Sequence, residues 1–199
     1  MTDIETRSVK YVDGVMATLS KMRTDFPKKA QEIVGELLKA RDSGKRIYIM
    51  GNGGSASTAS HMASDLNKGA NRKDAPRFKA IALTDNIPAM LAWANDSSYE
   101  DVFLEQLTNH VEKGDVVIGI SGSGNSVNVL KAIEHANRVG AVTIGLTGFD
   151  GGVLNKICKV SYVVPNDCMQ QVEDVHLLIE HMISIILRDS PECTGKQRK

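Results

Sequence analysis

The segment from Ile47 to Gly69, IYIMGNGGSASTASHMASDLNKG, runs from an apolar strand through glycines and serines into a helix. Its turn fits the G-x-G-x-x-A pattern of dinucleotide-binding folds, where glycines let the backbone approach a pyrophosphate. That pattern also needs an acidic residue about 20 positions later, at the end of a second strand. Here that position falls within NKGANRKDA, which has no strand character. We therefore expect no nucleotide cofactor.

Strands and helices alternate along the rest of the chain, which predicts an α/β fold with a parallel sheet covered on both faces. The predicted strands cover 46–50, 78–83, 115–120, 141–147 and 160–165, and the main helices cover 55–68, a segment from about 126, and 170–188. Before them, apolar residues at helical spacing predict two helices over 4–23 and 27–43. These boundaries give an N-terminal helical hairpin over 1–44, an α/β domain over 45–190 and a polar tail over 191–199.

The composition argues against several classes of partner. Acidic and basic residues balance at 24 each, so no net charge attracts nucleic acid or a membrane surface. No apolar run approaches the length of a membrane span, and the N-terminal residues have no signal-peptide core. Three cysteines without C-x-x-C spacing predict reduced thiols. We therefore expect a cytoplasmic protein that binds neither nucleic acid nor membrane.

A second glycine- and serine-rich loop, SGSGNS, follows the strand at 115–120. Ser121, Ser123 and Ser126 add hydroxyl donors to a glycine backbone, and the helix that starts near Ser126 points its positive end the same way. No G-K-[ST] follows, so this is not a P-loop. Either loop alone is more simply a tight turn with a helix cap. Two such loops at the carboxyl ends of parallel strands predict a site for a phosphate monoester.

Two predicted helices carry polar faces that could supply ligands or acid and base groups. His61 and Asp65 are four residues apart and share a face of the first. On the last helix, Glu173 pairs with His181 at two turns' separation, while Glu173, His176 and Glu180 form a competing strip, and spacing does not choose between them. Imidazoles and carboxylates suit Zn²⁺ or another divalent metal, and equally general acid–base catalysis. For an isolated pair, a hydrated surface ion pair is the simpler interpretation.

The chain resembles the sugar isomerase (SIS) family, and within it the phosphoheptose isomerase branch. The resemblance spans nearly the whole chain and rests on the motifs GNGGSAS, HMASDL, WANDSSYEDVF, GDVVIGISGSGNSVNVLKAIEHA, IGLTGFDGG and EDVHLLIEH. It implies a three-layer α/β/α domain with a five-stranded parallel sheet. It further implies a homotetramer with active sites between subunits.

The resemblance also implies roles for individual residues. The sugar phosphate would contact Asn52, Gly53, Ser55, Ser121, Gly122, Ser123, Ser126 and Glu173. One zinc ion per subunit would be held by His61, Asp65, Glu173 and His181. The family usually has Glu at position 65, Gln at 173, often Arg at 69 and commonly Asp at 170, whereas this chain has Asp65, Glu173, Gly69 and Gln170. The shorter carboxylate at Asp65 displaces the expected base by about one methylene, a scale on which catalysis is sensitive.

The activity implied is an aldose–ketose isomerisation, of sedoheptulose 7-phosphate to D-glycero-D-manno-heptose 7-phosphate, through an enediol(ate). Asp65 would be the base and His181 the acid, although ligation of zinc by Asp65 competes with that role. A related branch lacks the acid–base pair and acts as a replication-initiation adaptor. A non-catalytic phosphosugar-binding or adaptor protein is therefore the alternative function.

The segment LTDNIPAMLAWANDSSYEDVF, residues 83–103, resembles the family's active-site loop. By that resemblance Asp85 and Asn86 contact sugar hydroxyls, and Asp96 does so across a subunit interface. Asp85 and Asn86 could equally just terminate a strand. Met90 and Trp93 have the helical spacing of core residues.

Overall fold

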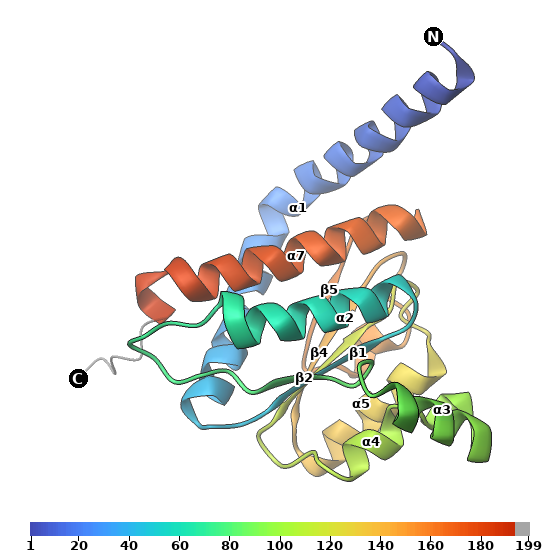
Figure 1. Ribbon diagram of the computed structural model, residues 1–199. Coiled ribbons are helices and arrows are strands. Elements are labelled where there is room, and N and C mark those ends of the chain that lie inside the picture. The colour runs from blue at the N-terminus through green and yellow to red at the C-terminus, as the bar shows by residue number, and fades with distance from the viewer. Residues whose placement is uncertain (194–199) are drawn as a thin grey trace.

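The computed structural model describes residues 1–193, which form a five-stranded, wholly parallel sheet between layers of helices (Figure 1). The predicted α/β class and strand number are confirmed, with observed bounds of β1 Ile47–Gly51, β2 Ala80–Ala82, β3 Val116–Ile120, β4 Val142–Thr147 and β5 Val160–Val163. The strand order is β2-β1-β3-β4-β5. In the described residues, no helix is both long and apolar enough to cross a membrane.

The two faces of the sheet bury separate cores because strand side chains alternate between them. Ile47 and Ile49 face the long helices α1 (Asp3–Asp42), α2 (Gly54–Ser64) and α7 (Met169–Asp189). Tyr48 and Met50 face the opposite layer. That layer holds α3 Ile87–Asp96, α4 Leu104–Thr108, α5 Val127–Val139 and α6 Leu154–Ile157. Met90 and Trp93 of α3 pack against this second core, as their spacing predicted.

The topology brings the two glycine-rich loops together. The chain leaves β1 toward β2 on one side, and leaves β3 toward β4 on the other, so β1 and β3 flank the point where strand order reverses. Their register pairs Gly51 with Ile120, so both strands end at the same level. Ligands of open α/β sheets bind outside the carboxyl ends of the strands at this point.

The predicted N-terminal hairpin is wrong, because residues 3–42 form one continuous helix, α1. Pro27 lies inside it, where it removes one backbone hydrogen bond. Phe26 and Ala30 are buried on the same stripe on either side of the proline, and Tyr162 donates a hydrogen bond to Asp25 at 3.1 Å. Tertiary contacts on both sides of Pro27 therefore hold the helix together, and no glycine offers a turn there.

The helix predicted over 55–68 changes geometry partway. Its α-helical part, α2, ends at Ser64, and Asp65–Gly69 form a π-helical turn closed by the Ala70 N–H donating to the Asp65 carbonyl at 2.7 Å. Such wider turns inside helices occur frequently at functional sites. Here the turn begins at Asp65, one of the candidate site residues.

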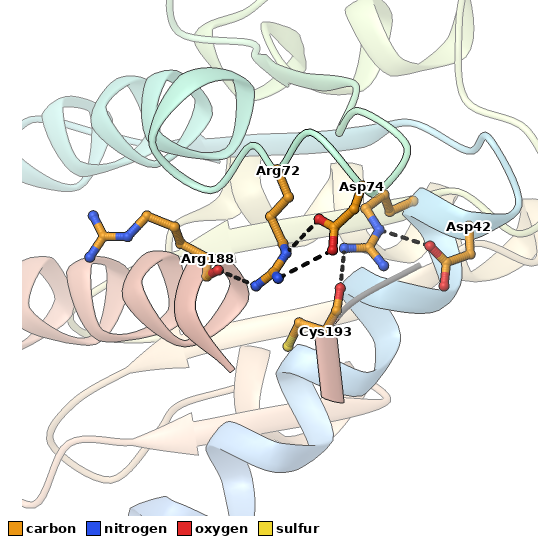
Figure 2. Close-up of polar contacts among 6 residues, drawn as sticks. Asp42, Arg72, Asp74, Arg188 and Cys193 are labelled. Carbon is orange, nitrogen blue, oxygen red and sulfur yellow. Dashed lines mark hydrogen bonds and ion pairs between the residues drawn. The ribbon is translucent and has the colours of Figure 1, made fainter. Parts of the chain in front are cut away.

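A polar cluster fixes the ends of α1 and α7 and the loop after the π turn (Figure 2). Arg72 pairs with Asp74 and donates to the Arg188 carbonyl near the end of α7. Arg41, buried on α1, donates to the Cys193 carbonyl at 2.9 Å and stacks over the Phe78 ring. The predicted polar tail is therefore wrong for residues 191–193, which form a 3₁₀ turn with a buried cysteine. Residues 194–199 lie outside the described part of the chain.

Candidate active site and metal-binding cluster

The loops after β1 and β3 are joined by a reciprocal amide pair. Asn52 and Asn128 each donate from Nδ2 to the other's Oδ1 at 2.9 Å. The Tyr99 hydroxyl donates to the same Asn52 oxygen at 2.8 Å. Asn52 is therefore committed to holding the two loops together, and the loop backbone and serines remain for a ligand.

The serine hydroxyls converge at this junction. Ser55 is buried in the first turn of α2, and Ser121 is buried at the end of β3. The Ser121 and Ser126 Oγ atoms lie 3.0 Å apart, and Ser126 precedes the first turn of α5. The two glycine- and serine-rich segments, 51–56 and 121–126, each lead into a helix and contain no lysine or arginine, an arrangement suited to a phosphate dianion.

Glycines keep this cradle compact. Gly124 has φ +67°, and a methyl group on it would lie 2.1 Å from the Gly151 carbonyl oxygen. Gly53, with φ +53°, has open space beside it and leads into α2. Gly122 lies against the Met169 side chain. Ser123 is half-buried, and its hydroxyl accepts from the Asn125 N–H at 3.3 Å.

A second cluster lies where α2 and the π turn face α7. The candidate ligand atoms of His61, Asp65, Glu180 and His181 all lie within 4.8 Å of one another. The Nε2 atoms of His61 and His181 are 3.3 Å apart, and Glu180 Oε2 is 3.5 Å from His181 Nε2. Two imidazoles and two carboxylates form a donor set that first-row divalent metals accept.

Glu180 is the unexpected member of this cluster. Its side chain is fully buried, and neither carboxylate oxygen has a hydrogen-bond partner among the described residues. Burial, and after it the adjacent Asp65 carboxyl, raises the pKa of Glu180 to about 8. A buried carboxylate without a donor is costly unless a proton or a cation neutralises it. The residues present therefore fit a bound cation.

The structure does not bring Glu173, the fourth ligand expected by resemblance, into this cluster. Glu173 lies two turns earlier on α7, and a methyl group on Gly54 would be 2.5 Å from its Oε2. It lines a cavity of about 210 Å³ beside the first turns of α2, which His61 also borders. His176, the other member of the competing strip, is buried and bonds the Thr147 carbonyl through Nε2 at 3.1 Å.

The residues of 83–103 that were predicted to contact the sugar lie elsewhere on the subunit. Asp85 accepts a short hydrogen bond from Ser60 and lines a surface pocket at the β2 edge. Asn86 caps α3 by accepting a hydrogen bond from the Ala89 N–H at 3.4 Å. Asp96 is exposed at the end of α3. Within one subunit, these residues join neither the serine cradle nor the histidine cluster.

Sequence reasoning missed two residues of the site, Asn128 and Tyr99, and it left Glu180 only as a member of the competing strip on the last helix. Asn128 and Tyr99 hold Asn52, and long-range amide pairing of this kind leaves no local pattern. Glu180 did leave one: it occupies the buried stripe of α7 beside Ile179 and Ile183, where a charged residue needs a reason. The neighbouring His181 places that buried carboxylate in a cluster of possible metal ligands.

Comparison with known proteins is consistent across sequence and structure. The family model for the SIS domain matches residues 10–148. A phosphoheptose isomerase of Aliarcobacter butzleri is 42% identical over 80% of this chain and 82% of its own length. The chain belongs to the SIS-domain family, in its phosphoheptose isomerase branch. Phosphoheptose isomerase 2 of Campylobacter jejuni is 39% identical over 81% of this SIS-domain chain and 79% of its own.

Solved SIS-domain structures superpose over nearly the whole chain. A phosphoheptose isomerase from Neisseria gonorrhoeae matches with a TM-score of 0.86 and 27% identity, over 92% of this chain and 98% of that one. A phosphoheptose isomerase from Francisella tularensis matches with a TM-score of 0.85 and 25% identity, over 94% and 98%. The resemblance inferred from motifs is therefore confirmed, and the chain is a sugar-phosphate isomerase of this family.

Proposed function

We propose that the protein interconverts sedoheptulose 7-phosphate and D-glycero-D-manno-heptose 7-phosphate. The observation that carries this proposal is the coexistence of a neutral serine cradle at the sheet edge with a convergent His61, Asp65 and His181 group. The first suits a phosphate dianion, and the second suits proton transfer. The phosphoheptose isomerases that the chain resembles support the choice of a heptose phosphate.

The cradle is proposed to bind the phosphate through Ser55, Ser121, Ser123 and Ser126 and the amides around Gly53 and Gly122. Hydroxyl and amide donors need not change protonation state, so binding should vary little with pH around neutrality. In the chain, Asn52 positions the loops, and Glu173 lies beside the first turn of α2. Glu173 is proposed to approach the sugar hydroxyls from there.

The proposed reaction moves two protons and no net electrons. Asp65 takes a proton from C1 of the ketose, the C–H electron pair forms the C1=C2 bond, and the C2 carbonyl oxygen gains a proton from His181. The resulting enediol returns a proton to C2 from Asp65, while His181 accepts the O1 proton as the C1 carbonyl forms. His61 Nε2 lies 3.3 Å from His181 Nε2, so the two imidazoles are neighbours in the proposed site.

Zn²⁺ is the proposed cofactor, held by His61, Asp65 and His181 with a carboxylate of α7. When bound, such a cation polarises the carbonyl and hydroxyl oxygens at C1 and C2 as a Lewis acid. Ligation would compete with proton transfer at both Asp65 and His181.

The active protein is proposed to be a homotetramer with active sites between subunits. Ser55 and Asp65 are ten positions apart, about 15 Å along a helix, so the cradle and the histidine cluster of one subunit are well separated. The N-terminal part of α1 projects from the domain and exposes Val9, Val12 and Met16 (Figure 1). These apolar residues at helical spacing need partners.

The alternative, a phosphosugar-binding adaptor without turnover, would need only the cradle. The convergence of His61, Asp65 and His181 favours the enzyme, because a purely binding protein gains nothing from a second cluster of acid and base groups.

The test follows sedoheptulose 7-phosphate by NMR with wild type, Asp65→Asn and His181→Gln. Each variant should lose turnover by about 10²–10⁴-fold, the usual share of general acid–base catalysis. Thr108→Ala, an exposed change at the end of α4, should keep full activity. Unchanged turnover in both active-site variants would refute the assignment of base and acid.

A further inference from the structure

The strongest unexplained feature of the molecule is the buried carboxylate on α7, two turns away from the ligand that the family resemblance implies. Glu180 is fully buried and its oxygens make no hydrogen bond within the described residues, while Glu173 is half-buried against Gly54. Both are glutamates on α7, so only their positions decide which of them could be a metal ligand.

We infer that Glu180, and not Glu173, supplies the α7 carboxylate ligand of the metal site, completing a set with His61, Asp65 and His181. This inference rests on the proposed metal-dependent function and extends it to the identity of a ligand. Residue 180 lies outside the positions that the family resemblance assigned.

The spacing of the ligand atoms supports this set. Tetrahedral zinc with metal–ligand bonds of about 2.0–2.2 Å separates its ligand atoms by about 3.3–3.6 Å. The His61 and His181 Nε2 atoms are 3.3 Å apart, and Glu180 Oε2 and His181 Nε2 are 3.5 Å apart. Both distances from His181 Nε2 therefore already equal those between ligands around one small cation.

Charge supports it as well. When both are ionised, Asp65 and Glu180 offer two negative charges, which a divalent cation balances. The cluster also lacks an arginine at position 69, where a methyl group on Gly69 would lie 3.3 Å from Asp65 Oδ1 and from Ser184 Oγ, closer than an ordinary contact. A cation between the two carboxylates would satisfy both, and would explain a buried Glu180 without a donor.

Glu173 is poorly placed for the same task. Its carboxylate faces the first turn of α2 and the cavity lined by Ser57 and Thr58, on the side of His61 toward the serine cradle. A carboxylate near a helix N-terminus is favourably placed without any metal. Its oxygens, unlike those of Glu180, are not among the buried atoms that lack a hydrogen-bond partner in the described residues.

The two glutamates form a matched pair for testing. Zn²⁺ affinity is measured by competition with a chromophoric chelator for wild type, Glu180→Gln and Glu173→Gln, each first stripped of metal. Glu180→Gln should weaken Zn²⁺ binding by more than about 100-fold, above the roughly 10- to 100-fold range for loss of an outer-sphere partner. Glu173→Gln should stay within about threefold of wild type.

A spectroscopic readout separates a ligand from a nearby positioning group. The visible absorption of the Co²⁺-loaded protein should change in Glu180→Gln, because a ligand is lost, and should be unchanged in Glu173→Gln. Without metal, the Glu180→Gln protein should melt at or above the wild-type temperature, because the substitution removes a buried carboxyl that faces Asp65. That result would show that loss of metal is not loss of fold.

The inference is overturned if Glu173→Gln loses Zn²⁺ while Glu180→Gln retains it, if both retain it, or if the wild-type protein binds no divalent metal. These outcomes are distinct from failure of the proposed function. A protein that isomerises sedoheptulose 7-phosphate yet binds Zn²⁺ equally in both variants overturns only the ligand assignment. Metal binding that depends on Glu180 without any isomerisation overturns only the function.

Discussion

The hydroxyls of Ser121 and Ser126 lie 3.0 Å apart and form a hydrogen bond with each other. A bound phosphate would accept hydrogen bonds from both hydroxyls in place of that contact. Ser121→Ala removes a donor to a charged group, a contact usually worth about 1.5–3 kcal/mol. We therefore expect KM for the phosphosugar to rise by about 10- to 100-fold with kcat changed much less. Steady-state kinetics check this, with Thr108→Ala as the control. A fall in kcat at unchanged KM would show that Ser121 acts in the chemistry and not in phosphate binding.

Some contacts between individual residues can be predicted from the sequence, and others cannot. Ser121 and Ser126 are close in sequence after one strand, so their contact could be predicted from the local pattern. The partners of Asn52 could not, since Asn128 is 76 residues away. On α7 the sequence pattern left Glu173 and Glu180 as alternative candidates for the carboxylate beside His61 and Asp65. Only the packing of α2 against α7 distinguishes them, because it brings Glu180 into that cluster.

At the scale of elements, α7 contains a histidine whose burial makes stability depend on pH. Burial lowers the pKa of His176 to about 4, whereas an unfolded histidine titrates near 6.5. Above pH 6.5 both states are neutral. As pH falls from 6.5 toward 4, His176 takes up a proton in the unfolded state but stays neutral in the folded state. The free energy of unfolding therefore falls by up to about 1.4 kcal/mol per pH unit.

His176→Gln keeps a donor for the Thr147 carbonyl and removes this titration. Urea unfolding at pH 7.5 and 5, at one protein concentration, should show wild type losing about 1–2 kcal/mol more than the variant. Equal losses would mean that His176 is protonated in the folded protein.

The loop between β3 and α5 makes a second prediction at this scale. Gly124→Ala forces a methyl group toward the Gly151 carbonyl at a positive φ, so it should destabilise the subunit by at least about 2 kcal/mol. Gly35→Ala on α1 is the control, since no atom lies within 4 Å of its added methyl and alanine favours a helix. Urea unfolding compares the two variants, and a Gly124→Ala protein as stable as wild type would contradict the close loop approach.

The elements also show why the hairpin prediction failed. Pro27 near an apparent helix start is the usual sign of a new helix, and the apolar spacing on each side is helical by itself. The structure instead continues through the proline, because buried Met22, Phe26 and Ala30 pack as one stripe on the sheet layer. The cost of a proline inside a helix, about 3 kcal/mol, is outweighed by a contact surface that local pattern does not reveal.

At the scale of the whole molecule, the projecting part of α1 exposes an apolar stripe that a partner could cover. If it packs between subunits, light scattering after size exclusion should give about four times the chain mass of 21.6 kDa. Val12→Asp places a charge on that apolar face and should shift the protein to smaller species. Glu134→Lys, exposed on α5, should leave the mass unchanged. A monomeric wild type would contradict the tetramer.

The central claim, that this chain turns over a heptose phosphate, is tested most directly by NMR of sedoheptulose 7-phosphate incubated with the wild-type protein, with and without added Zn²⁺. The account predicts that an aldoheptose 7-phosphate accumulates to an equilibrium mixture that is also reached from the aldose side. Binding of the phosphosugar with no aldose formed under either condition would contradict it, and would leave a phosphosugar-binding protein in place of an isomerase.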